Sequence, residues 1–456
     1  MHAVYRPNAD FAKLNHPLRV PLSAEIHSRP FLQLEAPETL THFALYVPQE
    51  QPSQKQHRAT QLRILEELCV HFGVTAPNAQ ARYFFHDFGP FRLKWESHTE
   101  FATYTFVERG QDGQGWQAAF EQPPLQHVPQ EWLASLHGKI IVASHVALRR
   151  DPLDGADSYD VRELFHGKSL VGSNVANGGQ LWTDFLIQPD GFSRFVVRDI
   201  GLREAQAGRL VGRLLEIETY RMMALLGLPQ AEATQPELNG IENELSQLTA
   251  ALVQEQPNGA GTEQELLHQI TSLAARLEKL SVSNSYRFAA SQAYFSLVQS
   301  RIQELREARI EGMPTLAEFM GRRLGPAMQT CVSVAQRQET LAKRIARSND
   351  LLRTRVGIEQ EGQNRKILQS LDTRAAQQLH LQQAVEGLSV VAISYYTLGL
   401  VGYGGKALKA AGLPVNPEAL TGLMVPAVVV GVWFFLRKLH HQLKAAASSL
   451  AKSPHQ

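Results

Sequence analysis

The sequence predicts an α/β cytoplasmic domain at the N-terminal end, a long α-helical stalk after it, and two C-terminal transmembrane helices. Three observations lead to this fold class. Before Gly201, segments rich in aromatic and β-branched residues alternate with amphipathic helical patterns. After Gly201, apolar residues recur at helical spacing. Two apolar runs without a charged residue then follow, at 387–405 and 419–436. We therefore expect strands and helices first, helices alone next, and a membrane hairpin last.

The length of 456 residues suits two or three domains. We expect an α/β cytoplasmic domain at 1–201, a helical stalk region at 202–385, a transmembrane hairpin at 386–437 and a cytoplasmic tail at 438–456. Within the hairpin, the two helices are expected at 386–405 and 419–436.

Charge and cysteine content narrow the class of protein. The formal net charge is +1, so no overall positive field favours nucleic acid as a partner. Cys69 and Cys331 are the two cysteines and lie far apart in the sequence. The first twenty residues contain no apolar segment of the kind found in signal peptides. These features predict a reducing compartment for most of the chain.

The elements of the first domain follow from local patterns. The stretch 56–73 has apolar residues at helical spacing and ends at Gly73, which suits a helix C-terminal cap. Pro189, Asp190 and Gly191 favour a tight turn between two strands. A second, shorter helix is expected at 131–138. The predicted strands lie within 41–48, 81–88, 92–106, 139–148, 180–188 and 192–200.

Long helices are expected after Gly201. The first of them should end at Gly227 and Pro229, and a later one should break or kink at Gly325-Pro326. Between them runs a heptad-like ladder of apolar residues, of the kind found in coiled coils, which keeps one seam of a helix facing a partner helix. Its members are Leu266, Ile270, Leu273, Leu277, Leu280, Phe295, Val298, Ile302 and Leu305. The seam fits packing within one subunit, in helical hairpins, or a contact between subunits.

Each charge-free run is long enough to cross a bilayer. At about 1.5 Å per residue, each gives roughly 28 Å of helix, close to the hydrocarbon thickness of a membrane. Nearly every face of 423–436 is apolar, whereas a soluble helix keeps a polar stripe. The alternative is a buried hairpin of a soluble protein. Gly404 and Gly405 are expected to end the first membrane helix.

Basic residues predict the orientation of this hairpin. They gather before the first span and after the second, and Lys406 and Lys409 in the connecting loop are partly offset by Glu418. The positive-inside rule then places both termini in the cytoplasm and the loop on the outer side of the membrane. The flanking residues are Arg365, Lys366, Arg374, Arg437, Lys438 and Lys444.

Three stretches resemble a bacterial family of predicted membrane-anchored proteins of unknown function. They are 14–31, 93–106 and 214–229. With the two terminal spans, the resemblance covers nearly the whole chain. It implies membrane anchoring and says nothing about activity.

The order of the domains is similar to that of the CorA-type two-span magnesium channels. That resemblance implies a homo-oligomer, with a pentamer as the first expectation, whose first spans surround an ion pathway. Those channels carry Tyr-Gly-Met-Asn at the outer mouth, and this chain has Tyr403, Gly404, Gly405 and Lys406 there. Lysine only donates hydrogen bonds, and a ring of lysines would repel Mg²⁺. Ser394 and Thr397 are the candidate pore-lining residues.

Two clusters of polar residues are further candidate sites. The segment 14–31 carries His16, Arg19, Glu25, His27 and Arg29, which could bind an anion, a partner strand or a metal ion. The alternative is an extended N-terminal arm pinned to the α/β domain by its charges and prolines.

Glu96, His98 and Glu100 form the second cluster and alternate onto one face of a strand. They could bind a divalent ion, or they could be the solvated side of a sheet.

The sequence offers no signature of an enzyme. It contains no phosphate-binding loop, no HExxH, no CxxC and no G-x-S-x-G motif, and we expect no enzymatic activity and no cofactor. Two functions remain open. One is an ion channel or transporter without the usual magnesium signature, and the other is a membrane-anchored scaffold or interaction protein. The expected partners are the lipid bilayer and further copies of the chain.

Overall fold

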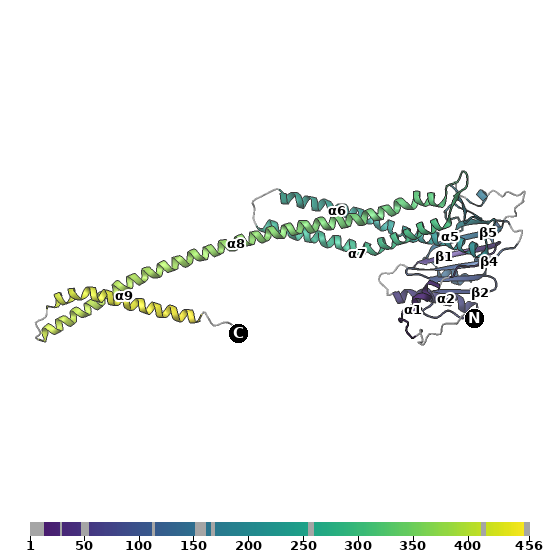
Figure 1. Cartoon of the computed structure of the whole chain (residues 1–456). Coiled ribbons are helices and arrows are strands. Elements are labelled where there is room, and N and C mark those ends of the chain that lie inside the picture. The colour runs from purple at the N-terminus through teal and green to yellow at the C-terminus, as the bar shows by residue number, and fades with distance from the viewer. Residues whose placement is uncertain are drawn as a thin grey trace, which may run out of the picture. The chain divides into compact units, whose positions relative to one another are not determined.

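The computed structural model of the chain describes residues 13–27, 30–46, 54–111, 115–150, 161–165, 169–253, 260–411 and 416–450. The chain forms two compact units. The first comprises 1–256 with 268–349, and the second comprises 257–267 with 350–456. The N-terminal sheet, the helices that follow it and the two apolar helices at the end give the mixed α/β architecture that the sequence predicts (Figure 1).

The strands lie in the first unit and form one sheet. Their order is β2-β3-β4-β1-β5-β8-β7-β6-β9, and neighbouring strands are antiparallel except for β5 and β8, which are parallel. The bounds are β1 Glu38–Tyr46, β2 Tyr83–Asp87, β3 Arg92–Ser97, β4 Phe101–Arg109, β5 Ile140–Arg150, β6 Val171–Val175, β7 Gly179–Thr183, β8 Ser193–Asp199 and β9 Ala308–Arg309. Each stretch expected as a strand overlaps one, except that 92–106 overlaps two, β3 and β4. The turn 189–191 connects β7 to β8 as predicted.

The helices lie before, between and after these strands. Their bounds are α1 Arg19–His27, α2 Gln54–His71, α3 Ala118–Glu121, α4 Gln130–Ser135, α5 Glu204–Leu225, α6 Gly227–Val253, α7 Ala260–Leu305, α8 Leu316–Ala410 and α9 Pro417–Leu450. Two short 3₁₀ helices lie at Pro124–His127 and Val161–Leu164.

The two faces of the sheet near β1 differ in chemistry. Phe43 and Leu45 point to one face, where they pack with Trp95 and with Leu65 and Leu68 of α2. Side chains alternate along a strand, so the residues between them point to the opposite face, which α5 covers. On that side many of the strand residues are polar, and they include His42, Lys94, Glu96, Thr103 and Thr105.

Gly208 permits the close approach of α5 to the chain that precedes β1. A Cβ atom at this position would lie 1.6 Å from the carbonyl oxygen of Leu32, so any other residue would force the two segments apart. The Leu34 N–H also donates to the Glu204 carbonyl at 3.4 Å. The first turns of α5 are thereby fixed against the sheet domain.

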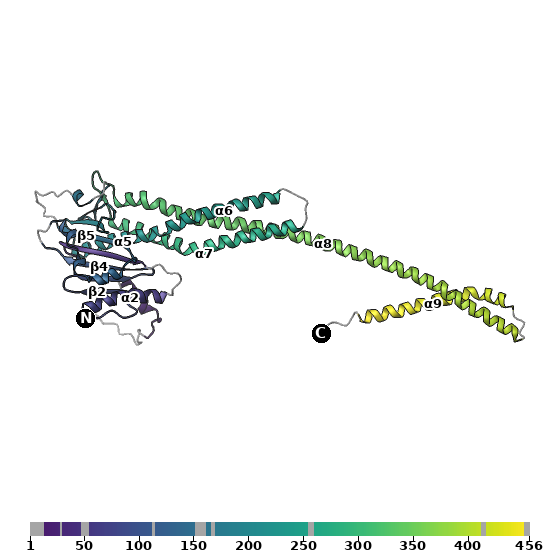
Figure 2. The same ribbon diagram turned by 180° about the vertical axis from the view of Figure 1, so that it is seen from behind.

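Within the first unit, α6, α7 and the beginning of α8 lie side by side (Figures 1 and 2). Polar contacts join the three helices. Glu242 of α6 accepts hydrogen bonds from Arg337 and Arg344 of α8, and Gln230 of α6 donates to Asn284 of α7 at 2.8 Å. Helix α5 ends at Leu225, close to the end expected at Gly227. A new helix, α6, begins at Gly227 itself and contains Pro229 and Pro236.

The heptad-like ladder lies on α7. Most of its members are buried within a single chain, so packing inside one subunit explains these positions without a partner chain. The buried members are Ile270, Leu273, Leu277, Val298, Ile302 and Leu305.

Helix α8 corrects two expectations. It continues through Gly325-Pro326, because Leu324 and Met328 on either side are buried and hold this turn in place. It also continues past Gly404 and Gly405 to Ala410. A helical glycine costs about 1 kcal/mol relative to alanine, which packing against a neighbouring helix can offset. Helix α8 thus runs without interruption from a polar region into an apolar one.

Candidate functional site

The N-terminal cluster does not gather into a site among the described residues. His16 is exposed and its Nδ1 accepts from the Leu18 N–H at 3.2 Å, while Arg19 is exposed and donates to Asn15 at 2.5 Å. Glu25 and His27 belong to α1, which replaces the extended arm expected there. Their side chains lie outside the described set, as does Arg29.

The second predicted cluster takes part in a small polar pocket between the sheet and α5. Glu96 and His98 line it with His42, Lys94 and Glu216, and its volume is about 40 Å³. A buried water needs roughly 10–15 Å³, so the pocket has room for a few water molecules. No group of three or more His, Cys, Asp or Glu in the described part of the chain is placed to hold a metal ion.

Charges in this pocket are paired with one another. The ammonium of Lys94 lies 2.9 Å from a carboxylate oxygen of Glu96, and Glu216 forms an ion pair with Arg301 of α7. Burial raises the pKa of Glu216, and Arg301 opposes this effect. Burial also lowers the pKa of His42 to about 3. His42 is therefore neutral at pH 7, and its ring nitrogens meet the hydroxyls of Thr105 at 2.9 Å and Thr219 at 3.1 Å.

The sequence predicted that Glu100 shares one face of a strand with Glu96 and His98. This prediction is wrong. Strand β3 ends at Ser97 and β4 begins at Phe101, so Glu100 lies in the turn between them. It forms a buried ion pair with Arg287 of α7. Its role in the structure is to join the turn to this helix.

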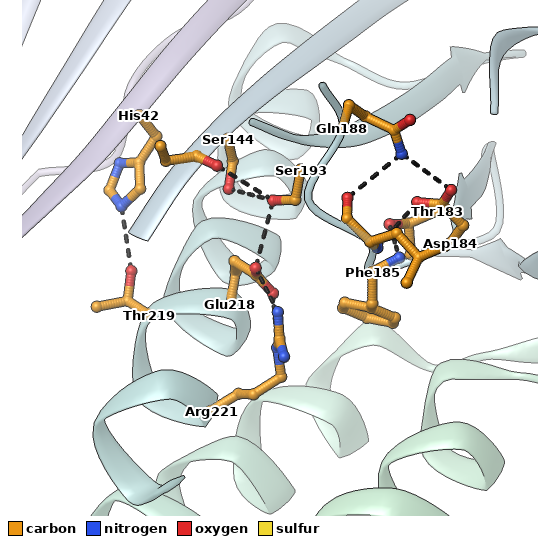
Figure 3. A network of polar contacts seen from close by, with 12 residues as sticks. His42, Ser144, Thr183, Asp184, Phe185, Gln188, Ser193, Glu218, Thr219 and Arg221 are labelled. Atoms are coloured by element: carbon orange, nitrogen blue, oxygen red, sulfur yellow. Dashed lines mark hydrogen bonds and ion pairs between the residues drawn. The ribbon is translucent and has the colours of Figure 1, made fainter. Parts of the chain in front are cut away.

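A chain of polar contacts runs from the sheet into α5 (Figure 3). The hydroxyls of Ser144 on β5 and Ser193 on β8 lie 2.8 Å apart, and Ser193 donates to Glu218 at 3.3 Å. Arg221 then donates to both oxygens of Glu218, at 2.8 and 2.6 Å. Only 4% of the Glu218 side chain is exposed, so its charge depends on Arg221 for compensation.

The loop after β7 holds a strained residue next to this network (Figure 3). Phe185 has a φ of 55°, which is unusual for a bulky side chain. The Phe185 N–H donates to Thr183 at 3.1 Å, and Asp184 accepts from the Leu186 N–H at 3.1 Å and from Gln188 at 3.0 Å. These bonds fix the loop so that the Phe185 ring lies near the guanidinium of Arg221, 5.2 Å from its centroid.

The candidate residues predicted from the sequence did not include Phe185, Glu218 or Arg221. The last two lie within the stretch 214–229, where a signal was available: opposite charges three residues apart on the apolar stripe of a helix. Nothing in the sequence indicated the positive φ of Phe185.

In the second unit, the end of α8 and α9 are both apolar enough to cross a membrane. Only 6% of the most apolar stretch of α8 and 0% of that of α9 are buried. Their exposed side chains are large, such as Leu388 at 73%, Tyr395 at 75% and Leu423 at 79%. These two helices therefore indicate that the protein associates with a membrane.

The predicted pore-mouth residues lie on the last turns of α8. The ammonium of Lys406 lies 5.8 Å from the ring centroid of Tyr403, and both residues are exposed. Gly405 faces α9, and a Cβ atom there would lie 3.4 Å from Pro417. At Gly404 a Cβ atom would meet nothing within 4 Å.

The two predicted pore-lining residues differ in environment. Ser394 is 4% exposed and its hydroxyl has no hydrogen-bond partner among the described residues. The Thr397 hydroxyl donates to the Ile393 carbonyl one turn earlier, at 2.8 Å. The arrangement within one chain thus buries Ser394 and satisfies Thr397 locally.

A family model with the description "Protein of unknown function (DUF3422)" matches residues 14–443. The chain belongs to this family. This confirms the expected membership of a family of unknown function, and it leaves the CorA resemblance as a hypothesis. No curated protein matches the chain. One similar solved structure is described as "structure of the full-length CmaX protein". It is 12% identical, over 66% of this chain and 89% of that chain, with a TM-score of 0.18. A similarity at this level carries no argument about fold or function.

Proposed function

We propose that this chain is a bacterial inner-membrane protein whose two C-terminal helices anchor the α/β domain and its helices on the cytoplasmic side as a scaffold. The exposure of the two apolar helices carries this proposal. Most of their surface is covered by no described residue, and apolar surface of that extent requires lipid or another protein. The alternative of a soluble buried hairpin would require the opposite, namely helices covered by the rest of the chain.

The charges beside the spans support the orientation. Arg365, Lys366 and Arg374 precede the first span, and Arg437 and Lys438 follow the second. Positive charge before the first span and after the second span favours two cytoplasmic termini.

Cysteine labelling tests this topology. In a chain with Cys69 and Cys331 replaced by serine, a single cysteine is placed at Ala410 or at Ser449. An impermeant thiol reagent on intact cells should label position 410 and leave position 449 unlabelled, because only the loop is expected outside. Permeabilised cells should label both, which controls for the reactivity of each thiol. Labelling of position 449 alone in intact cells would contradict the hairpin.

A homo-oligomeric ion channel is the second candidate. It is supported by the middle of α8, where exposed apolar side chains include Ile358, Ile367, Leu368 and Leu371. A lone helix with such a surface is unstable in water, and a second copy of the chain would cover it. A pentamer is the first expectation. Mass photometry that finds only monomers in several detergents would exclude a channel, because two spans enclose no pore.

Substitution of Lys406 separates the two candidates. In a channel, Lys406 from each subunit would surround the outer mouth and repel divalent cations. Lys406→Asn should then raise divalent cation entry in a liposome flux assay. If the two helices serve only as an anchor, the Lys406 ammonium lies at the membrane–water interface. The substitution then changes neither ion flux nor assembly. The burial of Ser394 favours the anchor, because a residue that lines a pore faces water, and we expect no flux for either protein.

A further inference from the structure

The first unit contains a second, larger cavity next to the strained loop after β7. Its volume is about 390 Å³, at the lower end of the range for small-molecule sites, which is about 300–1,000 Å³. Apolar side chains from three elements line just over half of it: Phe185 from the loop, Leu225 from α5, and Phe319, Met320 and Leu324 from α8. We refer to it as the Phe185 cavity.

Two arginines give this apolar cavity a cationic side. Arg221 lines it, and its bonds to Glu218 use Nε and one terminal nitrogen, which leaves the other terminal nitrogen without a partner among the described residues. Arg323 also lines it and forms no ion pair with a described residue. The one carboxylate in the lining, that of Asp184, accepts a hydrogen bond on each of its two oxygens from its own loop.

The wall formed by Phe185 is held in place before any ligand arrives. Its ring stacks on Phe319 with centroids 4.9 Å apart and an angle of 15° between the planes. The positive φ of Phe185 costs free energy, and strain of this kind concentrates at binding sites. The hydrogen bonds of Thr183, Asp184 and Gln188 hold the loop in this conformation, which reduces the entropy lost when a ligand binds.

We propose that the Phe185 cavity binds a free, single-chain organic anion, with its apolar body among Phe185, Phe319 and Leu324 and its carboxylate or similar head on Arg221 and Arg323. The apolar lining excludes a bare inorganic anion as the preferred ligand. The unpaired donors of the two arginines select an anion over a neutral or cationic molecule with the same body.

The test uses the full chain in amphipol and isothermal titration calorimetry, with hexanoate, hexan-1-ol, hexylammonium and acetate as probes. Hexanoate should bind saturably and about tenfold more tightly than hexan-1-ol, since hydrogen bonds to charged groups exceed neutral ones. Hexylammonium and acetate should bind more weakly than hexanoate. Equal affinities for hexanoate and hexan-1-ol, or for hexanoate and acetate, would overturn the proposal. Tighter binding of dihexanoyl phosphatidate than of hexanoate would assign the cavity to a lipid and overturn the single-chain ligand.

Two neighbouring arginines provide a matched pair of variants. Arg323→Ala should weaken hexanoate about tenfold and leave hexan-1-ol unchanged, since it removes one donor to the head. Arg322→Ala removes the same charge from an exposed position outside the cavity and should leave both affinities unchanged. Both residues are exposed, so neither change threatens folding. Equal losses in the two variants would mean a general effect of surface charge and would refute the site.

A variant of the loop tests the apolar wall. Glycine adopts a φ of 55° without strain, so Phe185→Gly removes the ring and keeps the loop conformation accessible. Hexanoate and hexan-1-ol should both lose affinity, because both place their apolar chain against Phe185. Unchanged affinity for hexan-1-ol in this variant would contradict the proposed position of the apolar body.

Discussion

Buried titratable side chains of the sheet have pKa values that differ from those in water. Burial raises the pKa of Glu38 to about 7, although Arg92 beside it opposes the change. Burial lowers the pKa of His42 to about 3. The two shifts have opposite effects on stability. Glu38 contributes stability that is present below pH 4.5 and is lost as pH rises through 7. His42 contributes stability that is present above pH 6.5 and is lost as pH falls toward 3.

The shift of His42 predicts a loss of stability in mild acid. Below pH 6.5 the unfolded chain binds a proton at His42 and the folded chain does not, which lowers the free energy of unfolding by about 2 kcal/mol at pH 5. His42→Gln should be less stable at pH 7 and should lose less on going to pH 5. Urea unfolding followed by tryptophan fluorescence, to which the buried Trp95, Trp132 and Trp182 contribute, measures both. Glu38 is present in both proteins, so its contribution cancels in the difference; parallel pH profiles would contradict the assignment.

At the scale of elements, α8 and α9 pack through small residues. A Cβ atom at Gly402 would lie 3.4 Å from the Thr421 hydroxyl, and one at Gly405 would lie 3.4 Å from Pro417. Ser394 lies on the same face of α8 as Gly405, because the 11 residues between them correspond to about three helical turns. Small residues let two membrane helices approach closely, where dispersion replaces the missing hydrophobic effect. The packing explains why helix α8 does not end at its glycines.

This packing predicts different effects for two adjacent glycines. Gly405→Leu places a large side chain against Pro417 and Leu420 and should destabilise the hairpin. The expected cost is about 1–3 kcal/mol, the usual penalty for overpacking. Gly404→Leu points away from α9 and should be neutral or slightly stabilising, because leucine is the better helix former. The temperature at which half of the detergent-purified protein remains monodisperse measures the difference. Equal melting of the two variants would refute the packed face.

Local patterns predicted most elements, and their limits have physical causes. Aromatic and β-branched residues identified the strands of the first domain, and helical spacing identified α2 and the ladder of α7. The rules for helix ends failed at Pro326 and at Gly405. Both residues weaken an isolated helix, but tertiary contacts on neighbouring positions outweigh that cost. Propensity alone contains no term for such contacts.

At the scale of the whole molecule, the sites depend on contacts between distant parts of the sequence. Glu100 and Arg287 are 187 positions apart, and His42 and Thr219 are 177 positions apart. No pattern within either segment indicates the partner. The sequence therefore identified Glu96, His98 and Glu100 as polar residues near one another, but it could not assign two of them to the α5 pocket and the third to α7. The Phe185 cavity is formed by three separate elements and had no local signal at all.

The Glu100–Arg287 pair predicts how strongly the sheet depends on α7. The two side chains are 9% and 10% exposed, and Nη1 of Arg287 already has no partner among the described residues. Glu100→Gln would leave a buried guanidinium without its counter-charge and should lower the free energy of unfolding by about 3–5 kcal/mol. The exposed pair of Arg276 and Glu244 is the control, since Glu244→Gln should cost about 0–1 kcal/mol.

A double variant separates the loss of a contact from the exposure of an uncompensated charge. Replacing the buried pair by Glu100→Leu and Arg287→Met removes both charges and should recover much of the stability that Glu100→Gln loses, because apolar side chains of similar volume can fill the same space. Urea unfolding monitored by the fluorescence of the buried tryptophans measures all four proteins on one scale. If Glu100→Gln cost no more than Glu244→Gln, the turn between β3 and β4 would not depend on Arg287. If the double variant were as unstable as Glu100→Gln, the geometry of the contact, rather than the charge, would join the sheet to α7.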